Sequence, residues 1–221
     1  MIAENIAKIK SIIPDDVQLI AVSKTKPIED ILEAYHAGHK VFGENRVQEL
    51  TEKYEALPKD IQWHMIGYLQ SNKVKYIAPF VHLIHGVHSL KLLKEINKRA
   101  KNENRVINVL LQFHIAEEDT KSGFSFEEVK EILENGEVSA LENISIKGVM
   151  GMATFTNDIE KIRNEFRTLN NYFLTLKGHF FKYNDEFSII SMGMSGDYEI
   201  AIEEGSNMIR LGSSIFGERN T

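Results

Sequence analysis

The most constraining feature of this sequence is a regular alternation of short apolar segments and segments with helical periodicity. The apolar segments are rich in β-branched residues, as expected for strands that are buried on both faces of a parallel sheet. We expect strands at residues 17–23, 40–42, 61–65, 82–85, 107–113, 144–150, 187–191 and 207–211. Between them, apolar residues recur three or four positions apart, which is the pattern of an amphipathic helix.

Eight strands joined by helical crossovers in 221 residues predict a closed α/β fold, the single (β/α)8 barrel or TIM barrel. An open, doubly wound sheet is the rival architecture, and hydrophobic periodicity alone does not separate the two. The sequence contains no linker rich in Gly, Pro or Ser and no short internal repeat. We therefore expect residues 1–221 to form one domain.

Composition and charge narrow the functional classes. The sequence has no cysteine, which excludes disulfides, thiolate metal sites and a cysteine nucleophile, and suits a reducing compartment. Its formal net charge of −6 gives no overall attraction to nucleic acid or to an anionic membrane. The N-terminus has an amphipathic pattern instead of the continuous apolar run of a signal peptide, and no apolar run reaches membrane-spanning length. We expect a soluble, cytoplasmic protein.

Glycines and polar residues follow the expected strands at their carboxyl ends, where β/α barrels build their active sites. The loops after the last two strands, residues 191–197 and 212–214, are rich in Gly and Ser. Glycine lets backbone N–H groups approach an anion closely, and serine hydroxyls supply further donors. Ordinary turns would explain either loop alone, but the two together favour a phosphate site.

Lys24 is the best-placed nucleophile, because it ends the first expected strand and would point towards the barrel mouth. Partial desolvation and a nearby cation such as Arg210 would lower its pKa from about 10.4. The resulting neutral amine could form an imine with an aldehyde. A surface lysine with a packed apolar stem is the alternative. Lys26, Lys73 and Lys121 could lie on the same face, but their positions beside a proline or in loops are less favourable.

Arg210 ends the last expected strand, two residues before Gly212. It could pair with a phosphate, or it could face a ring nitrogen and disfavour protonation of that ring. A rim arginine in an ion pair with Glu203 or Glu204 is the alternative.

The histidines give a weaker signal. His64 ends a strand beside the proposed site, and a packing role explains it nearly as well. Strand alternation places His82 and His85 on opposite faces, so a shared metal ion is not expected. The sequence also lacks an HExxH motif or a comparable ligand spacing. We expect no metal site.

The residues around this mouth resemble those of the pyridoxal-phosphate homeostasis proteins, a family of barrels similar to the N-terminal domain of alanine racemase. The matching segments span nearly the whole chain and are Ala21–Pro27 (AVSKTKP), Phe42–Glu49 (FGENRVQE), Trp63–Lys73 (WHMIGYLQSNK), Lys147–Thr154 (KGVMGMAT), Ser191–Asp197 (SMGMSGD) and Arg210–Glu218 (RLGSSIFGE).

The resemblance implies pyridoxal 5′-phosphate (PLP) bound as an imine on Lys24, phosphate contacts from the loops after the last two strands, and Arg210 at the pyridine nitrogen. It also implies a role in buffering or supplying the cofactor, with PLP-dependent apoenzymes as possible recipients. The cofactor contacts that we predict are Lys24, Asn45, His64, Ser191, Met194, Ser195, Arg210, Gly212 and Ser213.

Three positions depart from the pattern of the family. Tyr68 stands where His or Asn is frequent, His88 where Asp is common, and Gly196 where an acidic residue is usual. None of them is the lysine, the serines or the arginine of the expected site. They therefore bear on details of the site's properties, and the expectation of cofactor binding is unchanged.

Three functions remain open at this stage. A cofactor-supply protein without efficient turnover comes first, because two-base proton transfer needs a group on each face of the substrate carbon. The sequence stops directly after the last barrel segment, so we expect neither a second domain to provide that group nor a racemase-type dimer, and a monomer is the better expectation. A PLP-dependent amino-acid racemase or lyase of low activity is the alternative. A Schiff-base aldolase or other phospho-sugar barrel that keeps Lys24 and the phosphate loops but lacks the cofactor is the third.

Overall fold

The computed structural model describes residues 1–117 and 122–217, and its parallel strands form a closed barrel in sequence order. The strands are β1 (Gln18–Val22), β2 (Val41–Glu44), β3 (Gln62–Met65), β4 (Leu83–Val87), β5 (Ile107–Gln112), β6 (Ile144–Met150), β7 (Ile189–Ser191) and β8 (Met208–Leu211). Each strand pairs with its neighbours in sequence, and β1 closes the barrel against β8. The prediction of a TIM barrel is confirmed, and the open doubly wound sheet is excluded.

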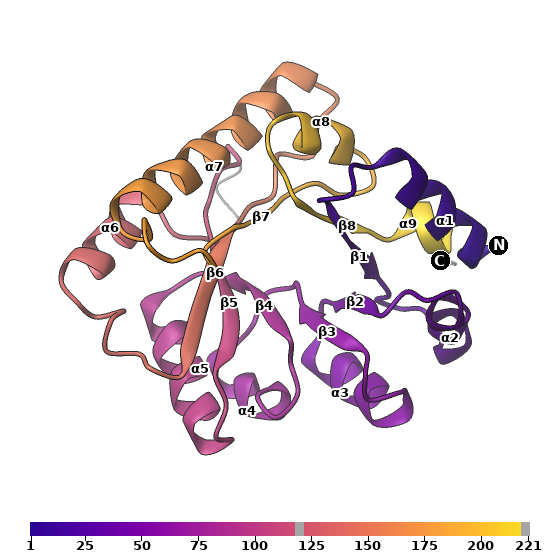
Figure 1. Ribbon diagram of the computed structural model, residues 1–221, viewed down its shortest axis with the longest axis horizontal. Helices are drawn as coiled ribbons and strands as arrows, with labels where there is room; N and C mark the ends of the chain where they lie inside the picture. Colours follow the sequence, from indigo (N-terminus) through magenta and orange to yellow (C-terminus); the bar gives the residue numbers. More distant parts are fainter. Residues whose placement is uncertain (118–121, 218–221) are drawn as a thin grey trace.

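Helices surround the strands (Figure 1). They are α1 (Ile2–Ile12), α2 (Ile28–His36), α3 (Val47–Ala56), the 3-10 helix η1 (Ser71–Lys73), α4 (Val74–Ile77), α5 (Leu90–Asn102), α6 (Phe126–Glu134), α7 (Ile159–His179), α8 (Tyr198–Glu203) and α9 (Ser213–Phe216). In the described ranges, no helix combines the length and the apolar character that crossing a membrane would require.

Side chains at the helix starts explain where several helices begin. Ser89 accepts a hydrogen bond from the Leu92 amide at 3.2 Å at the start of α5. Ser125 and Glu128 form a reciprocal capping box at the start of α6. The first and last described helices lie side by side, where the Asn5 side chain donates to the Ile215 carbonyl at 2.9 Å (Figure 1).

Two predicted strand ends moved because of pairing in the barrel. The segment predicted at 40–42 continues to Glu44, since Gly43 and Glu44 both pair with β3. The segment predicted at 187–191 begins only at Ile189. Phe187 is buried instead by stacking on Phe181, with ring centroids 4.1 Å apart. Apolar character therefore predicted burial correctly here, but not strand pairing.

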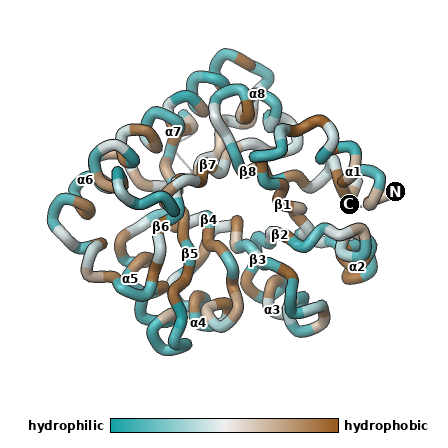
Figure 2. Tube along the Cα trace, in the orientation of Figure 1, coloured by the Kyte–Doolittle hydropathy of each residue, from teal (hydrophilic) through white to brown (hydrophobic). Residues whose placement is uncertain are grey.

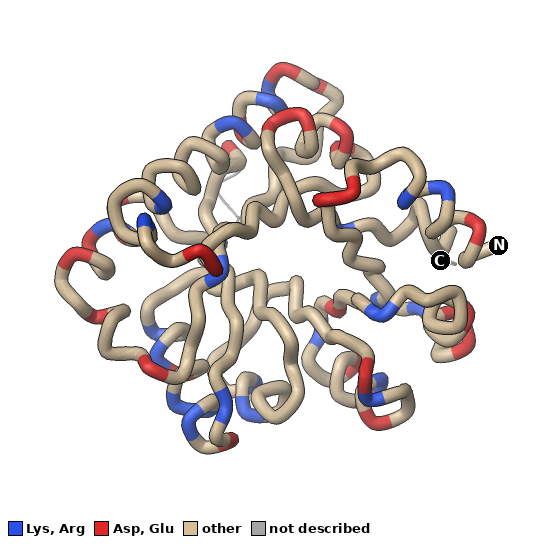
Figure 3. Tube along the Cα trace, viewed as in Figure 1, with Lys and Arg blue, Asp and Glu red and all other residues tan. Residues whose placement is uncertain are grey.

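The core has two layers. The larger one fills the space between strands and helices, and the smaller one fills the barrel with Ile20, Leu83, Leu110, Met150 and Met208. Figure 2 shows apolar residues along the strands, and Figure 3 shows Lys, Arg, Asp and Glu mainly on the surrounding helices and loops. An apolar plug of this kind makes the barrel a packed core with a site only at its end.

Strand alternation shows which side chains point into the barrel near the site. Side chains two residues apart on a strand share a face. Leu83 of β4 and Met208 of β8 belong to the apolar plug, so His85 and Arg210 also point into the barrel, closer to the carboxyl ends of the strands. On β4 and β8, the side chains inside the barrel are therefore apolar near the amino ends of the strands and polar near their carboxyl ends.

Candidate functional site

A cavity of about 850 Å³ opens at the carboxyl ends of the strands. Most of the predicted cofactor contacts line it, namely Lys24, Asn45, Met194, Ser195, Arg210, Gly212 and Ser213. These residues come from the ends of β1, β2, β7 and β8 and from the loops that follow. The structure thus brings together segments that are up to 189 positions apart in the sequence, between Lys24 and Ser213.

Lys24 reaches the cavity because of strand alternation. Val22, two residues earlier on β1, also lines the cavity, whereas Ser23 is fully buried outside it. The chain turns sharply directly after the lysine, where Thr25 adopts a φ of +64°. This is the left-handed region, which is unusual for a β-branched residue and marks a constrained backbone.

The other candidate lysines are less suitable. The Lys26 ammonium also reaches the cavity, but it donates to the Phe216 carbonyl at 3.1 Å. The Lys73 ammonium lies 5.6 Å from the ring centroid of Tyr76. Lys121 lies outside the described residues. Lys24, which lies two residues after the end of β1 and lines the cavity, is the candidate nucleophile.

The two Gly/Ser loops lie side by side, as a shared anion site requires. Gly212 donates its amide to the Ser195 hydroxyl at 3.3 Å and so links the loops after β7 and β8. The earlier loop depends on Gly193, whose φ is +102° and whose hypothetical Cβ would lie 2.7 Å from the Ala201 Cβ. A side chain at this position would therefore displace α8 and open the loop.

Arg210 is 3% exposed and reaches the cavity from inside the barrel. Its guanidinium donates to the Ser191 hydroxyl at 2.5 Å and to the Gly151 carbonyl at 3.2 Å. Burial lowers the pKa of Arg210 to about 10, so the side chain remains cationic at neutral pH. Glu203 and Glu204 bind Arg163 instead, so the interpretation of Arg210 as a rim arginine paired with them is wrong.

His64 and Ser191 lie within the barrel rather than in the cavity wall, with exposed fractions of 1% and 0%. His85 joins them. Its Nδ1 lies 2.8 Å from the Ser191 hydroxyl, and its Nε2 lies 2.8 Å from Nδ1 of His64. A continuous hydrogen-bonded row thus runs from Arg210 through Ser191 and His85 to His64. These buried groups hold the Arg210 guanidinium in place from inside the barrel, through the hydrogen bond to Ser191.

Sequence reasoning missed the role of His85. Alternation was expected to separate it from His82, yet both rings contact His64, with centroid distances of 5.1 Å and 5.4 Å. β4 begins only at Leu83, so His82 precedes the strand and strand alternation does not decide where its ring lies. Among residues 1–117 and 122–217, no group of three or more His, Asp or Glu side chains is arranged to hold a metal ion.

Burial sets the charge of this row. Burial, with a smaller contribution from the neighbouring His82, lowers the pKa of His64 to about 3. Burial also lowers the pKa of His85 well below its ordinary value, with smaller contributions from His64 and Arg210. Both imidazoles are therefore neutral at pH 7, and the guanidinium carries the only charge of the row.

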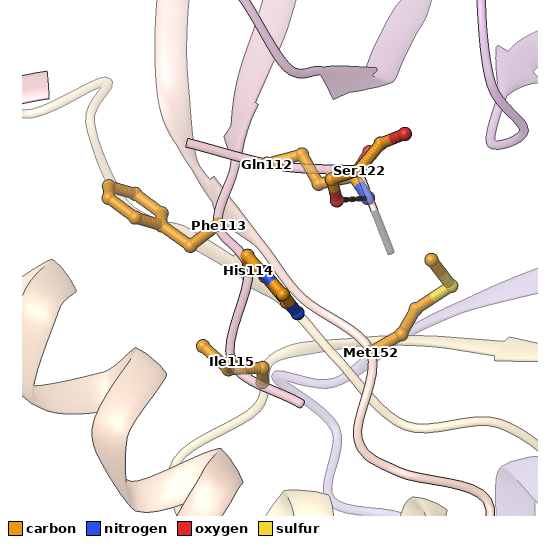
Figure 4. A pocket seen from close by; sticks show the side chains of 6 residues that line it. All are labelled: Gln112, Phe113, His114, Ile115, Ser122 and Met152. Atoms are coloured by element: carbon orange, nitrogen blue, oxygen red, sulfur yellow. Dashed lines mark hydrogen bonds between the residues drawn. The ribbon is translucent and has the colours of Figure 1, made fainter. Parts of the chain in front are cut away.

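A smaller pocket branches from the cavity beside β5, lined by Gln112, Phe113, His114, Ile115, Ser122 and Met152 (Figure 4). Gln112 donates its amide to the Ser122 carbonyl at 2.8 Å and closes one side of this branch. Gln112, Ser122 and Met152 line the main cavity as well. We therefore treat the branch as part of the same site.

Comparison with known proteins shows to which family the chain belongs. Residues 1–220 match the family described as the alanine racemase N-terminal domain. The chain belongs to this family. Within it, the chain is 43% identical over 203 residues to the pyridoxal phosphate homeostasis protein of Aquifex aeolicus, covering 91% of this chain and 87% of that protein. It is 40% identical to the protein of the same name from Vibrio alginolyticus, covering 94% and 88%.

Solved structures of similar proteins show the same fold. PipY of Synechococcus elongatus PCC7942 without PLP superposes with a TM-score of 0.92 at 34% identity, covering 98% of this chain and all of that one. PipY with PLP bound gives a TM-score of 0.89. Alanine racemase of Clostridium difficile 630 gives 0.79 at 18% identity, with 100% of this chain and 57% of that chain covered, and supports the fold alone.

The three departures from the family pattern lie at or near the rim of the cavity. Tyr68 and Gly196 line it. The rings of Tyr68 and His88 are in contact, with centroids 4.5 Å apart. Two departures that are separated by 20 positions in the sequence therefore form one local pair in the structure.

Proposed function

We propose that this protein binds PLP and acts in PLP homeostasis by buffering or supplying the cofactor, which it holds as an imine on Lys24. The observation that carries the proposal is a single cavity in which Lys24, the buried Arg210 and two Gly/Ser loops converge. Relatives that are up to 43% identical are named for PLP homeostasis, and the similar PipY has been solved with PLP bound.

The donors around the cavity fit the two ends of the cofactor. Ser195, Gly212 and Ser213 offer hydroxyls and backbone amides to a phosphate, within reach of one another. Asn45 and Met194 would contact the ring from the loops after β2 and β7. His64 and Ser191 would orient Arg210 through the hydrogen-bonded row inside the barrel, without touching the cofactor.

Arg210 favours binding over turnover. PLP when bound supplies an electron sink whose strength depends on protonation of its pyridine nitrogen. A cationic guanidinium beside that nitrogen disfavours its protonation, and Arg210 is held in place by Ser191 and Gly151. The chain would thus retain the cofactor while weakening its ability to stabilise a carbanion.

The visible absorption spectrum of the purified protein tests this proposal. Lys24 forms a C=N bond with the aldehyde carbon and one water is released, so an imine band should appear when PLP is added. Borohydride adds hydride to that carbon and should fix a pyridoxyl group on Lys24, detectable by peptide mass spectrometry. Lys24→Ala should lose the band, whereas the matched Lys26→Ala should keep it. The absence of a band in the wild type would overturn the proposal and favour a Schiff-base aldolase.

A second candidate is a PLP-dependent amino-acid racemase or lyase of low activity. The observation that favours it is Tyr68, whose phenol lines the same cavity as Lys24 and could serve as a second acid/base. Deuterium exchange at the α-carbon of alanine or serine tests it. Exchange at metabolic rates that Tyr68→Phe abolishes would establish turnover, and a rate near the background of free PLP would leave cofactor supply as the function.

We further propose that the protein works as a cytoplasmic monomer and that PLP-dependent apoenzymes receive its cofactor. The sequence has no cysteine, which suits a reducing compartment. Activation of an apoenzyme by the PLP-loaded protein, faster than by the same concentration of free PLP, would support direct transfer. Sedimentation of the loaded protein as a dimer would contradict the monomer.

A further inference from the structure

A buried ion cluster lies behind the wall of the cavity, between β1, β2 and α3. It consists of Ser23, Glu44, Glu49 and Lys53. The Lys53 side chain is 7% exposed and that of Glu44 is 0% exposed. A buried charge of this kind is costly unless it is paired and hydrogen-bonded. These residues do not line the cavity, so cofactor contact does not explain them.

The ammonium of Lys53 is fully used. It donates to the Ser23 carbonyl, to Oε1 of Glu44 and to Oε1 of Glu49, each at 2.7 Å. An ammonium has three N–H donors, so these three contacts satisfy it. Oε1 of Glu44 also accepts the Ser23 hydroxyl at 2.5 Å, so Ser23 is bound through both its backbone and its side chain.

The cluster holds the backbone on both sides of Lys24. On one side, Lys53 binds the Ser23 carbonyl, which belongs to the peptide unit that precedes the Cα of Lys24. On the other side, Glu49 accepts the Thr25 amide at 2.6 Å, which belongs to the peptide unit that follows. Two rigid peptide planes flank the Cα of Lys24, and one ion cluster is bonded to both of them.

The positive φ of Thr25 needs support from neighbouring residues, and the ion cluster supplies it. A β-branched residue at φ +64° is unfavourable by itself and persists only where its surroundings impose it. The Glu49 carboxylate supplies such a constraint through the Thr25 amide, and Lys53 fixes the carboxylate through the i,i+4 ion pair on α3. The direction in which Lys24 leaves the strand depends on this turn.

We propose that Lys53, together with Glu49, is a positioning group for Lys24: it sets the backbone so that the Lys24 amine is presented to the aldehyde of PLP. The inference rests on the proposed function and adds residues that act through the lysine without contacting the cofactor. Because the positioning acts on the backbone, it is present before any ligand binds.

Two measurements on the same variants test the proposal. The first is the rate at which the imine band forms at saturating PLP, which should fall about tenfold or more in Lys53→Met, since misplacing a reacting group is that costly. The second is hydrogen exchange of the Thr25 amide without PLP, which should become faster in the same variant. Lys147→Met is the matched control. Lys147 lies on β6, its ammonium pairs with the Glu186 carboxylate at 2.6 Å before the start of β7, and neither residue lines the cavity.

Glu49→Ala keeps the test decisive if Lys53→Met does not fold. Glu49 has a side chain that is 23% exposed, so its truncation leaves the buried Lys53–Glu44 pair intact. Glu52→Ala on the same helix is its control, since Glu52 is exposed and its carboxylate accepts a hydrogen bond from the Gln48 side chain at 3.0 Å. Both the slower imine band and the faster Thr25 exchange are expected for Glu49→Ala and for neither control.

The outcomes separate the two proposals. A wild type that forms no imine on Lys24 overturns the proposed function. A wild type that forms it, with variants that react at the wild-type rate or keep the wild-type Thr25 exchange, overturns the positioning role alone. A slower band without faster exchange also counts against it, because the effect would then not pass through the backbone of Lys24.

Discussion

Ser191 accepts a hydrogen bond from the guanidinium of Arg210 at 2.5 Å, at the inner end of the cavity. The same hydroxyl lies 2.8 Å from Nδ1 of His85. A single serine thus connects the only charge in this row of side chains to two neutral imidazoles. The orientation of Arg210, on which the proposed choice between binding and turnover depends, is set by Ser191 inside the barrel and by the Gly151 carbonyl directly after β6.

Ser191→Ala should lower the free energy of unfolding by about 2 kcal/mol, because it leaves buried polar groups of Arg210 and His85 without this partner. Urea unfolding measures the effect. Ser188→Ala is the control, since Ser188 is exposed and its hydroxyl donates to the Glu186 carbonyl over a long distance of 3.4 Å. Equal stability of Ser191→Ala and the wild type would show that the row contributes little to the fold.

Removing only Lys53 from the buried Lys53–Glu44 pair should lower the free energy of unfolding more than removing both charges. Lys53→Met leaves the Glu44 carboxylate buried without its cation and should cost about 3–5 kcal/mol of unfolding free energy. Burial already raises the pKa of Glu44, and Lys53 opposes that shift. The double variant Glu44→Leu/Lys53→Met should recover much of the loss in the same urea titration. A double variant less stable than the single one would contradict this account.

Acid should destabilise the protein through its buried histidines, and His39 contributes one share of this effect beside His64 and His85. Burial, assisted by the charge of Lys10, lowers the pKa of His39 from 6.5 to about 4. Between these values the unfolded chain binds more protons than the folded one, so stability rises with pH in this range. The contribution is complete above the unfolded pKa and is lost as the pH falls, by about 2 kcal/mol at about pH 5. His39→Gln should flatten this part of the stability curve, and an unchanged slope would assign it to other groups.

Much of the fold could be predicted from local pattern. Mainly apolar runs such as Ile107–Gln112 identify strands, and parallel strands joined by helices leave few topologies. Lys24 and Arg210 could be placed at the mouth because each ends a strand. These predictions need only the period of a strand and the direction in which it runs.

The supporting contacts could not be predicted in this way. His85 and Ser191 lie 106 positions apart, and alternation gives the face of each side chain but not its partner across the barrel. The i,i+4 spacing of Glu49 and Lys53 is visible in the sequence, where it resembles an ordinary surface pair. Only the packing of α3 against the strands buries Lys53 and brings it to Ser23.

Thr25 and Asn104 offer a matched exchange that tests whether strain is stored beside Lys24. Both adopt a positive φ, of +64° and +53°, and both are exposed. Asparagine tolerates this region better than a β-branched residue does. Thr25→Asn should therefore raise the free energy of unfolding by about 1 kcal/mol, and Asn104→Thr, far from the cavity, should lower it by a similar amount.

The two substitutions should differ in their effect on the site. Asn104→Thr should leave the rate of imine formation unchanged, because it alters only the turn between α5 and β5. Thr25→Asn should keep the turn and its amide bond to Glu49 at lower conformational cost, so its rate should equal or exceed that of the wild type. Thermal unfolding and the stopped-flow imine band measure both properties on the same samples. A stabilised Thr25→Asn that reacts more slowly would mean that the threonine side chain itself, and not only the backbone turn, helps to present Lys24.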